Sequence, residues 1–355
     1  MIRPVSRPLL EIVELESWFQ TPSALIRAVD NVSLQVGERQ AIGVVGESGS
    51  GKTQTFFSAF GLTSGWPGVV AGRVRFDDTE LLAGLDQHVR VSERSGIEKN
   101  SSRWNAIHRQ RLLPILGHDV AMMSQDPRRS LIPYWTVGRH LMEVMQRRAT
   151  RPLTESDAHD LLGRFGFRKP ERLRRAYPEQ LSGGEAQRVM LALTTAMAPR
   201  LLIADEPTTA LDAVNQIRVL EELRRLHTES NVALVLISHD LGVVAGMVEY
   251  LLVFFGGRIL ERAPASVLGD DAPSSLHPYT VELLESQRRR SEGLPIAASV
   301  KESTGSRLSA GCPYATRCSL RPRLSIDLQV QCESVFPDEV ELEPNHFVAC
   351  WGVTS

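Results

Sequence analysis

The alternation of apolar and polar positions in the first sixty residues predicts three strands followed by a helix. Leu9–Leu15 and Val29–Val36 alternate in the manner of half-buried strands. Gln40–Val45 is a short apolar run of the kind found in a fully buried strand. The glycine-rich segment 46–53 follows it, and Gln54–Leu62 is predicted to be a helix. The chain therefore places a glycine-rich loop between a strand and a helix, which is the setting a phosphate-binding loop requires.

Further along the chain, apolar runs alternate with helical patterns. We predict strands at 121–124, 201–205 and 232–238, mainly helical structure from about 136 to 195, a helix at 215–227 and a hairpin at 251–263. Residues 86–118 are polar and rich in arginine, and the stretch 92–103 within them is predicted to be a loop. Beyond about residue 263 the chain becomes rich in Pro, Ser and Arg, so we expect a domain boundary there.

Composition narrows the class of protein. With 42% hydrophobic and 23% charged residues, the chain resembles an ordinary soluble globular protein. Its formal net charge of −2 gives no basic footprint for a nucleic-acid partner. No run approaches the ~20 apolar residues of a membrane helix, and the N-terminus lacks the apolar core of a signal peptide. We therefore expect a cytosolic protein that reaches a membrane only through a partner.

The segment GESGSGKT at 46–53 fits the phosphate-loop pattern. Its glycines allow backbone N–H groups to converge on phosphate oxygens, and the following helix presents its positive end. The loop residues expected to contact the nucleotide are Gly46, Ser48, Gly49, Ser50, Gly51, Lys52 and Thr53. Lys52 would reach the β- and γ-phosphates, and the Thr53 hydroxyl would bind Mg²⁺. The alternative is a glycine-rich turn without a ligand.

Two carboxylates end the apolar run LLIADEP. We expect Asp205 to help hold Mg²⁺ and Glu206 to polarise the attacking water. A single acidic residue at a strand end is commonly only a cap, but a pair downstream of a phosphate loop favours a catalytic role.

LSGGE at 181–185 distinguishes among phosphate-loop proteins. Ser182, Gly183 and Gly184 precede a predicted helix and form a second candidate anion site. Kinases, GTPases and helicases need no such second glycine-rich contact. The segment lies about 20 residues before LLIAD, and at this position it resembles the signature of the ABC ATPase family.

Other residues match motifs of that family in order and spacing. Gln125 resembles the Q-loop glutamine, Asp212 the D-loop acid and His239 the switch histidine that contacts the γ-phosphate. Phe19 aligns with the aromatic residue that stacks on adenine, with Trp18 as the alternative. The resemblance implies Mg²⁺ binding by Thr53, Gln125 and Asp205. It implies catalytic roles for Glu206, His239 and Gln125.

Several stretches resemble the oligopeptide, dipeptide and nickel importer branch of the family. These are GKTQT, SQDPRRSLIPYWTVG, SLHPYTVELLES at 275–286 and a tail containing CPYATRC. The chain departs from the branch in two places. The segment 86–118 is longer than usual, and Cys318 and Cys332 stand further apart in sequence.

The only four cysteines, Cys312, Cys318, Cys332 and Cys350, fall in the last 44 residues. Disulfides are disfavoured in the cytosol, and the irregular spacing differs from the paired pattern of zinc sites. Cys₄ ligation supports iron–sulfur clusters, and tails of similar importers are associated with a 4Fe–4S cluster. We therefore predict such a cluster here, with zinc or unligated cysteines as the alternatives.

The resemblance implies an α/β fold: a P-loop NTPase (ABC ATPase) core with an antiparallel β subdomain, a helical subdomain at about 136–195 and a C-terminal extension. The ATP-binding domain would span 1–263 and the extension 264–355. ATP would be held between the P-loop of one subunit and the LSGGE of another in a head-to-tail dimer.

The partners that the resemblance implies are a second ABC ATPase subunit (a copy or a paralogue), two transmembrane permease subunits and, indirectly, an extracytoplasmic solute-binding protein. The protein would lie on the cytoplasmic face of the inner membrane. The alternatives are a soluble ABC ATPase acting in DNA repair or on ribosomes, and a regulatory, non-catalytic cassette. The solute stays open: a peptide, a nickel complex or another molecule.

Overall fold

The computed structural model describes residues 7–22, 24–63, 65–92, 96–209, 211–269, 275–292 and 310–353. These divide into two compact units, which we describe separately. The first is assembled from the described parts of 1–37, 41–113 and 238–355, and the second from 38–40 and 114–237.

An antiparallel sheet opens the first unit. Its strands run in the order β2-β1-β4-β5, with bounds β1 Pro8–Gln20, β2 Leu25–Gly37, β4 Pro67–Phe76 and β5 Thr79–Glu80. Helix α1 (Lys52–Ala59) contacts β1, β2 and β4. Apolar side chains of this sheet and of α1 are buried, including Leu10, Val36, Val74 and Phe56. The alternating strands and the helix predicted from the sequence are confirmed here, with both strands longer than expected.

A second group of strands in the first unit joins the early chain to the late chain. Strand β3 (Ala41–Val45) pairs in parallel with β11 (Tyr250–Phe255), which pairs antiparallel with β12 (Arg258–Pro264). The predicted hairpin is therefore confirmed. Strand β14 (His346–Val348) continues the sheet from β12, and β13 (Val340–Glu343) pairs with β14. Residues near the C-terminus thus extend a sheet that contains residues near position 41.

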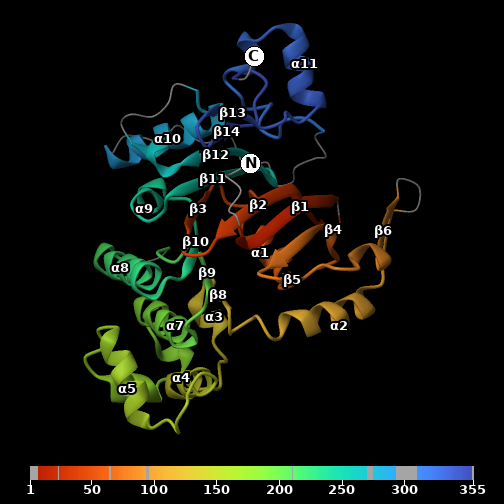
Figure 1. Cartoon of the computed structure of the whole chain (residues 1–355). Helices are drawn as coiled ribbons and strands as arrows, with labels where there is room; N and C mark the ends of the chain where they lie inside the picture. The colour runs from red at the N-terminus through yellow and green to blue at the C-terminus, as the bar shows by residue number, and fades with distance from the viewer. Residues whose placement is uncertain are drawn as a thin grey trace. The chain divides into compact units, whose positions relative to one another are not determined.

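The described segments after residue 264 belong to the same unit as these strands. They are η3 Ala265–Leu268, α10 Pro278–Ser291, η4 Arg321–Arg323 and α11 Ile326–Ser334. Figure 1 shows α10 beside β11 and β12, with α11 further along the same unit. The rings of Phe255, Tyr279 and Tyr314 meet edge to face or tilted, with centroids 4.7 to 5.4 Å apart. This aromatic cluster joins β11 to the late chain.

A buried carboxylate fixes the same junction. Glu261 of β12 is 1% exposed; its Oε1 lies 2.6 Å from Nε2 of His346, and its Oε2 accepts the N–H of His277 at 3.0 Å and the hydroxyl of Thr280. A buried carboxylate is tolerated when its oxygens are hydrogen-bonded in this way. Three separate parts of the chain therefore converge on one side chain.

The loop predicted at 92–103 is wrong. Strands β6 (Val89–Ser92) and β7 (Gly96–Lys99) form a hairpin, preceded by η1 (Leu85–Gln87) and followed by α2 (Ser101–Leu112). The Asn100 side chain caps α2 by accepting the N–H of Arg103. Trp104, His108 and Leu112 are buried at a spacing of four residues, so a narrow apolar stripe holds a helix that is otherwise polar.

The second unit contains three parallel strands and a group of helices. The strands lie in the order β10-β9-β8, with bounds β8 Val120–Met123, β9 Leu201–Asp205 and β10 Ala233–Ser238. The helical segments are α3 Pro127–Ser130, α4 Val137–Gln146, α5 Glu155–Arg164, α6 Pro170–Arg175, η2 Pro178–Gln180, α7 Gly183–Met197 and α8 Ala213–Ser230. Helix α7 packs on α4, α8 and β8, as Figure 1 allows the reader to follow. The predicted strands and helices of this region are confirmed.

None of the described helices combines the length and the apolar composition that a membrane span requires.

The buried His108 makes the first unit sensitive to acid. Burial, reinforced by the charges of Arg111 and Lys99, lowers its pKa to about 4. Between about pH 6.5 and 4 the unfolded chain takes up a proton that the folded chain refuses, so stability should fall as the pH falls through this window. We expect the free energy of unfolding of the native protein to drop, relative to His108→Gln, by up to roughly 3 kcal/mol at pH 4. Chemical denaturation at several pH values measures this, and parallel pH profiles for the two proteins would contradict it.

Candidate nucleotide-binding site

The glycine-rich loop has the backbone that its sequence predicts. Gly46, Gly49 and Gly51 all have positive φ, at 146°, 79° and 99°. A Cβ at Gly46 would lie 2.2 Å from the carbonyl oxygen of Phe254, and one at Gly51 would lie 2.3 Å from that of Ala28. Only glycine combines such φ values with such close approach. The loop is therefore held tightly between neighbouring strands.

Lys52 is the first residue of helix α1, and its side chain points back towards the loop. Its side chain is 5% exposed, and Nζ donates to the carbonyl oxygens of Gly46 at 2.8 Å and Glu47 at 2.7 Å and to Oγ of Ser50 at 3.4 Å. Ser48 and Gly49 are exposed at the crest of the loop, and Thr53 is half-buried. The ammonium group thus lies directly beneath the loop, where an anion bound to its N–H groups would meet a positive charge.

The geometry favours Phe19 over Trp18 as the accessible aromatic residue. Trp18 is 5% exposed and its ring is covered by the guanidinium of Arg27 at 4.4 Å. Phe19 is half-buried and pairs with Pro67 across the sheet. Lys99 of the hairpin β6-β7 donates to the carbonyl oxygens of Pro67 at 2.6 Å and Val69 at 2.7 Å. The segment 86–118 therefore supports the strand beside Phe19.

His239 is exposed at the end of β10, directly before an ordered turn. The next residue, Asp240, caps α9 (Leu241–Ala245) by accepting the N–H groups of Gly242 and Val243. Gln287 of α10 donates to the same carboxylate at 3.1 Å. Residues after position 264 thus help to fix the backbone that presents His239.

In the second unit, Gln125 and Glu206 meet. Gln125 Nε2 donates to Oε2 of Glu206 at 2.9 Å, and the Thr209 hydroxyl donates to the same oxygen at 2.9 Å. Glu206 has a φ of 47°, and its N–H donates to the carbonyl oxygen of Ile237. Such a left-handed conformation is unfavourable for a non-glycine residue and is often found at functional sites. Asp205, one residue earlier, is 7% exposed at the end of β9.

The signature segment begins helix α7 with a capping box. Ser182 Oγ accepts the N–H of Glu185, and the Glu185 carboxylate accepts the N–H of Ser182. Ser182 and Gly183 are exposed, and a Cβ on Gly183 would meet no atom within 4 Å. Gly184, by contrast, lies against the side chain of Asn215. The first turn of α7 therefore presents an open, positive helix end.

Asp212 has a structural task that the sequence did not reveal. It caps α8 by accepting the N–H of Asn215 at 2.9 Å, and the Asn215 amide donates to its second oxygen at 2.7 Å. These hydrogen bonds lower the pKa of the Asp212 carboxyl. Because Asn215 also lies against Gly184, the predicted D-loop and the signature segment are adjacent in this unit.

Sequence reasoning missed several partners of the predicted residues. Arg128 of α3 donates to the carbonyl oxygen of Leu181, which joins the segment after Gln125 to the signature segment. Tyr279 and Arg317 contact Glu47 inside the glycine-rich loop. Tyr279 lies in the HPYT element and Arg317 precedes Cys318, but neither position indicates in the sequence that its partner is Glu47.

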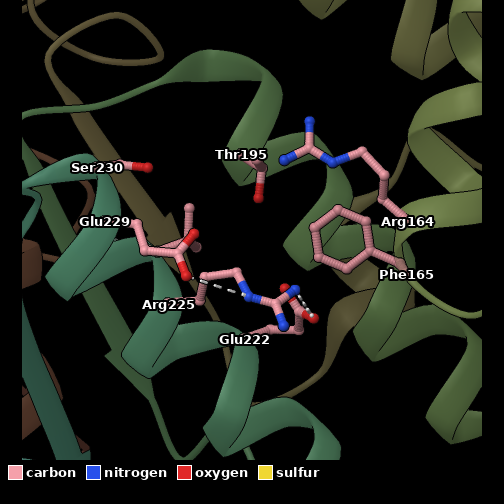
Figure 2. Close-up of a pocket in the computed structure, with 8 residues that line it drawn as sticks. Arg164, Phe165, Thr195, Glu222, Arg225, Glu229 and Ser230 are labelled. Atoms are coloured by element: carbon pink, nitrogen blue, oxygen red, sulfur yellow. Dashed lines mark hydrogen bonds and ion pairs between the residues drawn. The ribbon is translucent and has the colours of Figure 1, made fainter.

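A small pocket in the second unit lies apart from the predicted residues. Figure 2 shows Arg225 between Glu222 and Glu229 of α8, with Arg164 and Phe165 opposite. Its volume of about 40 Å³ has room for only a few water molecules. None of its lining residues belongs to a motif singled out above, and we assign it no substrate.

The four cysteines approach one another, but not as a metal site. Burial, together with a smaller contribution from the neighbouring cysteines, raises the pKa of Cys312 to about 12 and that of Cys350 to about 11. The N–H of Cys312 donates to the carbonyl oxygen of Cys332. Within the described residues, no three His, Cys, Asp or Glu side chains are arranged so that they could hold a metal ion. The ligand set expected for a 4Fe–4S cluster is therefore not formed in this structure.

Comparison with known proteins identifies the family. The model of the ABC transporter family matches residues 29–209. The dipeptide transport ATP-binding protein DppD of Haemophilus influenzae is 36% identical over 318 residues, covering 87% of this chain and 88% of that protein. DppD of Escherichia coli is 37% identical over 322 residues, covering 87% and 90%. The oligopeptide transport ATP-binding protein OppD of Mycobacterium tuberculosis is 35% identical over 97% of this chain, but this chain spans only 52% of its length.

A solved structure supports the fold. The dimeric ATP-binding cassette MJ0796, bound to ADP and phosphate in a post-hydrolysis state, matches 72% of this chain and 98% of its own chain, with a TM-score of 0.56 and 21% identity. The α/β fold expected from the sequence is thereby confirmed. The matched family model and the relatives of similar length lead to one conclusion: this chain belongs to the ABC transporter family.

Proposed function

We propose that this chain is the ATP-hydrolysing subunit of an importer for peptides or related solutes. The observation that carries the proposal is the glycine-rich loop, whose positive-φ glycines and underlying Lys52 support a role in binding phosphate groups. The dipeptide and oligopeptide transport proteins that resemble the chain over most of its length support the solute class. A nickel complex is the alternative solute that the sequence left open.

In the proposed reaction each motif has one task. The N–H groups of the loop from Gly46 to Gly51 and the Lys52 ammonium bind the phosphates, while Phe19 stacks on the base. Glu206 accepts a proton from the attacking water and is oriented by Gln125 and Thr209, which donate to its carboxylate. His239 contacts the γ-phosphate.

The residues expected at a metal ion have suitable chemistry. A hydroxyl, an amide and a carboxylate, from Thr53, Gln125 and Asp205, are oxygen donors of the kind that Mg²⁺ prefers. When bound, the ion neutralises charge that develops on the phosphates.

The proposed assembly is a head-to-tail pair of cassettes on two transmembrane permease subunits, at the cytoplasmic face of the inner membrane. An extracytoplasmic solute-binding protein would deliver the solute. The open first turn of α7, at Ser182 and Gly183, supports a phosphate contact made to a partner subunit. Purification from native membranes distinguishes this assembly from a soluble ABC ATPase: permease subunits should accompany the chain, and their absence would favour the soluble class.

Replacing the proposed base separates binding from hydrolysis. Glu206→Gln should bind ATP normally but hydrolyse it at least about 100-fold more slowly, since the amide cannot accept the proton. Nucleotide binding and phosphate release measure the two effects. Lys52→Ala is the matched contrast, because it should lose ATP affinity instead. Turnover by Glu206→Gln close to that of the native protein would remove the assignment.

The signature segment should act on the neighbouring subunit. Gly183→Asp fits its own subunit without a clash, and an acidic residue in the first helical turn is favourable there. It should nevertheless abolish hydrolysis by placing an anion against the partner's γ-phosphate, whereas Gly183→Ala should be tolerated. Mixed dimers of Gly183→Asp with Lys52→Ala should regain about half the activity, because one of the two sites then carries neither change. Mixed dimers without activity, or hydrolysis by a demonstrated monomer, would contradict this.

Chemical analysis of purified protein tests whether the cysteine tail binds the expected 4Fe–4S cluster. The ligand set is not formed in this structure, so we give the cluster no part in the reaction. If the cluster binds, anaerobically purified protein should be brown and contain about four irons per chain. A colourless anaerobic preparation, with stoichiometric zinc or with no metal, would exclude it.

A further inference from the structure

Residues from the C-terminal part of the chain hold Glu47, the second residue of the phosphate loop, by both its backbone and its side chain. The N–H of Glu47 donates to the hydroxyl of Tyr279 at 2.8 Å. Arg317 donates with Nη1 to Oε2 of Glu47 at 2.9 Å and with Nη2 to Oε1 at 2.8 Å. This fork-to-fork geometry is the strong, directional form of an arginine–carboxylate pair.

The guanidinium is itself fixed from behind. Nη2 of Arg317 also donates to Oε1 of Glu282 at 2.6 Å, and the Tyr314 hydroxyl donates to the other oxygen of Glu282. The Arg317 side chain is 19% exposed, and the two carboxylates raise its pKa above the ordinary value for arginine. Arg317 is therefore a rigid bridge between α10 and the phosphate loop rather than a mobile surface residue.

Glu47 is fixed on its other side by the lysine of the loop. The Glu47 carbonyl oxygen accepts a hydrogen bond from Lys52 Nζ at 2.7 Å. The N–H, the carbonyl group and the carboxylate of one residue are thus held by Tyr279, Lys52 and Arg317 respectively. A change in the orientation of Glu47 would move a contact of Lys52.

The positive charge of Arg317 gives its contact with Glu47 a second role beside orientation. An ionised Glu47 beside bound phosphates would repel them, and like charges a few ångströms apart in a partly buried site repel strongly. The Arg317 guanidinium, paired with both carboxylate oxygens, compensates that charge. Removing Arg317 would leave an unpaired anion inside the phosphate loop.

We infer that Arg317 is a positioning residue for the phosphate loop, through which the C-terminal extension sets the ATP affinity of its own subunit. Arg317 acts through Glu47, which it orients and whose charge it compensates. The inference rests on the proposed role of the loop in ATP binding. Native protein that failed to bind ATP at all would refute that role, whereas the comparisons below concern Arg317 alone.

The first experiment measures KM for ATP and kcat in full-length variants, together with equilibrium binding of a fluorescent ATP analogue. Arg317→Gln should raise KM and the dissociation constant about tenfold and change kcat less than about twofold. Arg317→Lys keeps the positive charge but loses the two-pronged hydrogen bonding of the guanidinium, so its KM for ATP should lie between those of the native protein and Arg317→Gln. Arg321→Gln is the matched control, because Arg321 pairs with Glu333 in the same extension and should leave KM unchanged.

A double-mutant comparison decides whether Arg317 acts through Glu47. In the Glu47→Gln background, Arg317→Gln should change KM by less than about twofold, because no carboxylate remains to be oriented or compensated. An undiminished tenfold effect in that background would overturn the inference, as would an unchanged KM for Arg317→Gln or an equal effect of Arg321→Gln.

Tyr279→Phe provides a test if Arg317→Gln does not fold. It keeps the ring that packs on Phe255 and Tyr314 and removes only the oxygen that accepts the Glu47 N–H. KM for ATP should rise severalfold without a matching loss of kcat. A KM equal to that of the native protein would show that holding Glu47 has no influence on ATP affinity.

Discussion

The phosphate loop imposes a steric constraint on the parts of the first unit that surround it. Its N–H groups can converge on an anion only if Gly46 and Gly51 adopt backbone angles that side chains rarely permit. At both positions a carbonyl oxygen of another strand occupies the space of a Cβ, from Phe254 in β11 and from Ala28 in β2. The loop is therefore rigid because two different sheets press on it. The antiparallel strands, β11 and the late chain that packs against β11 all contribute to one short turn.

The second unit achieves precision by a different means, through hydrogen bonds at helix and strand ends. Glu206, Ser182 and Asp212 each occupy the end of an element, and each side chain is oriented by neighbours within a few residues or by Gln125. Such ends leave backbone groups unpaired, and these groups orient polar side chains at little cost. The contrast is physical: the phosphate loop is fixed by packing, whereas the signature segment keeps its first turn open.

The sequence predicted those features whose signals are local. The strands around residues 9–45, the β11-β12 hairpin and the helix after LSGGE follow from periodicity and glycine position, and the structure confirms them. The prediction of a loop within the segment 86–118 was wrong because the buried face of α2 consists of only Trp104, His108 and Leu112, among many polar and charged residues. The contact of Arg317 with Glu47 could not be predicted, since its partners are 270 residues apart and nothing in either neighbourhood indicates the other. The spacing of the cysteines likewise gave no measure of how their thiols would be oriented.

The discontinuity of the first unit has a consequence for synthesis on the ribosome. Residues 114–237 of the second unit emerge almost as one run, so this unit can fold as soon as they have left the exit tunnel. The first unit can be completed only later, because β3 pairs with β11 and β12 pairs with β14. The side chain of Glu47 likewise pairs with Arg317, which is translated much later. Contacts between residues so distant in sequence form slowly. The glycine-rich loop is therefore translated well before Arg317 and β14, and the contacts that hold Glu47 in place cannot form until 270 further residues have been added.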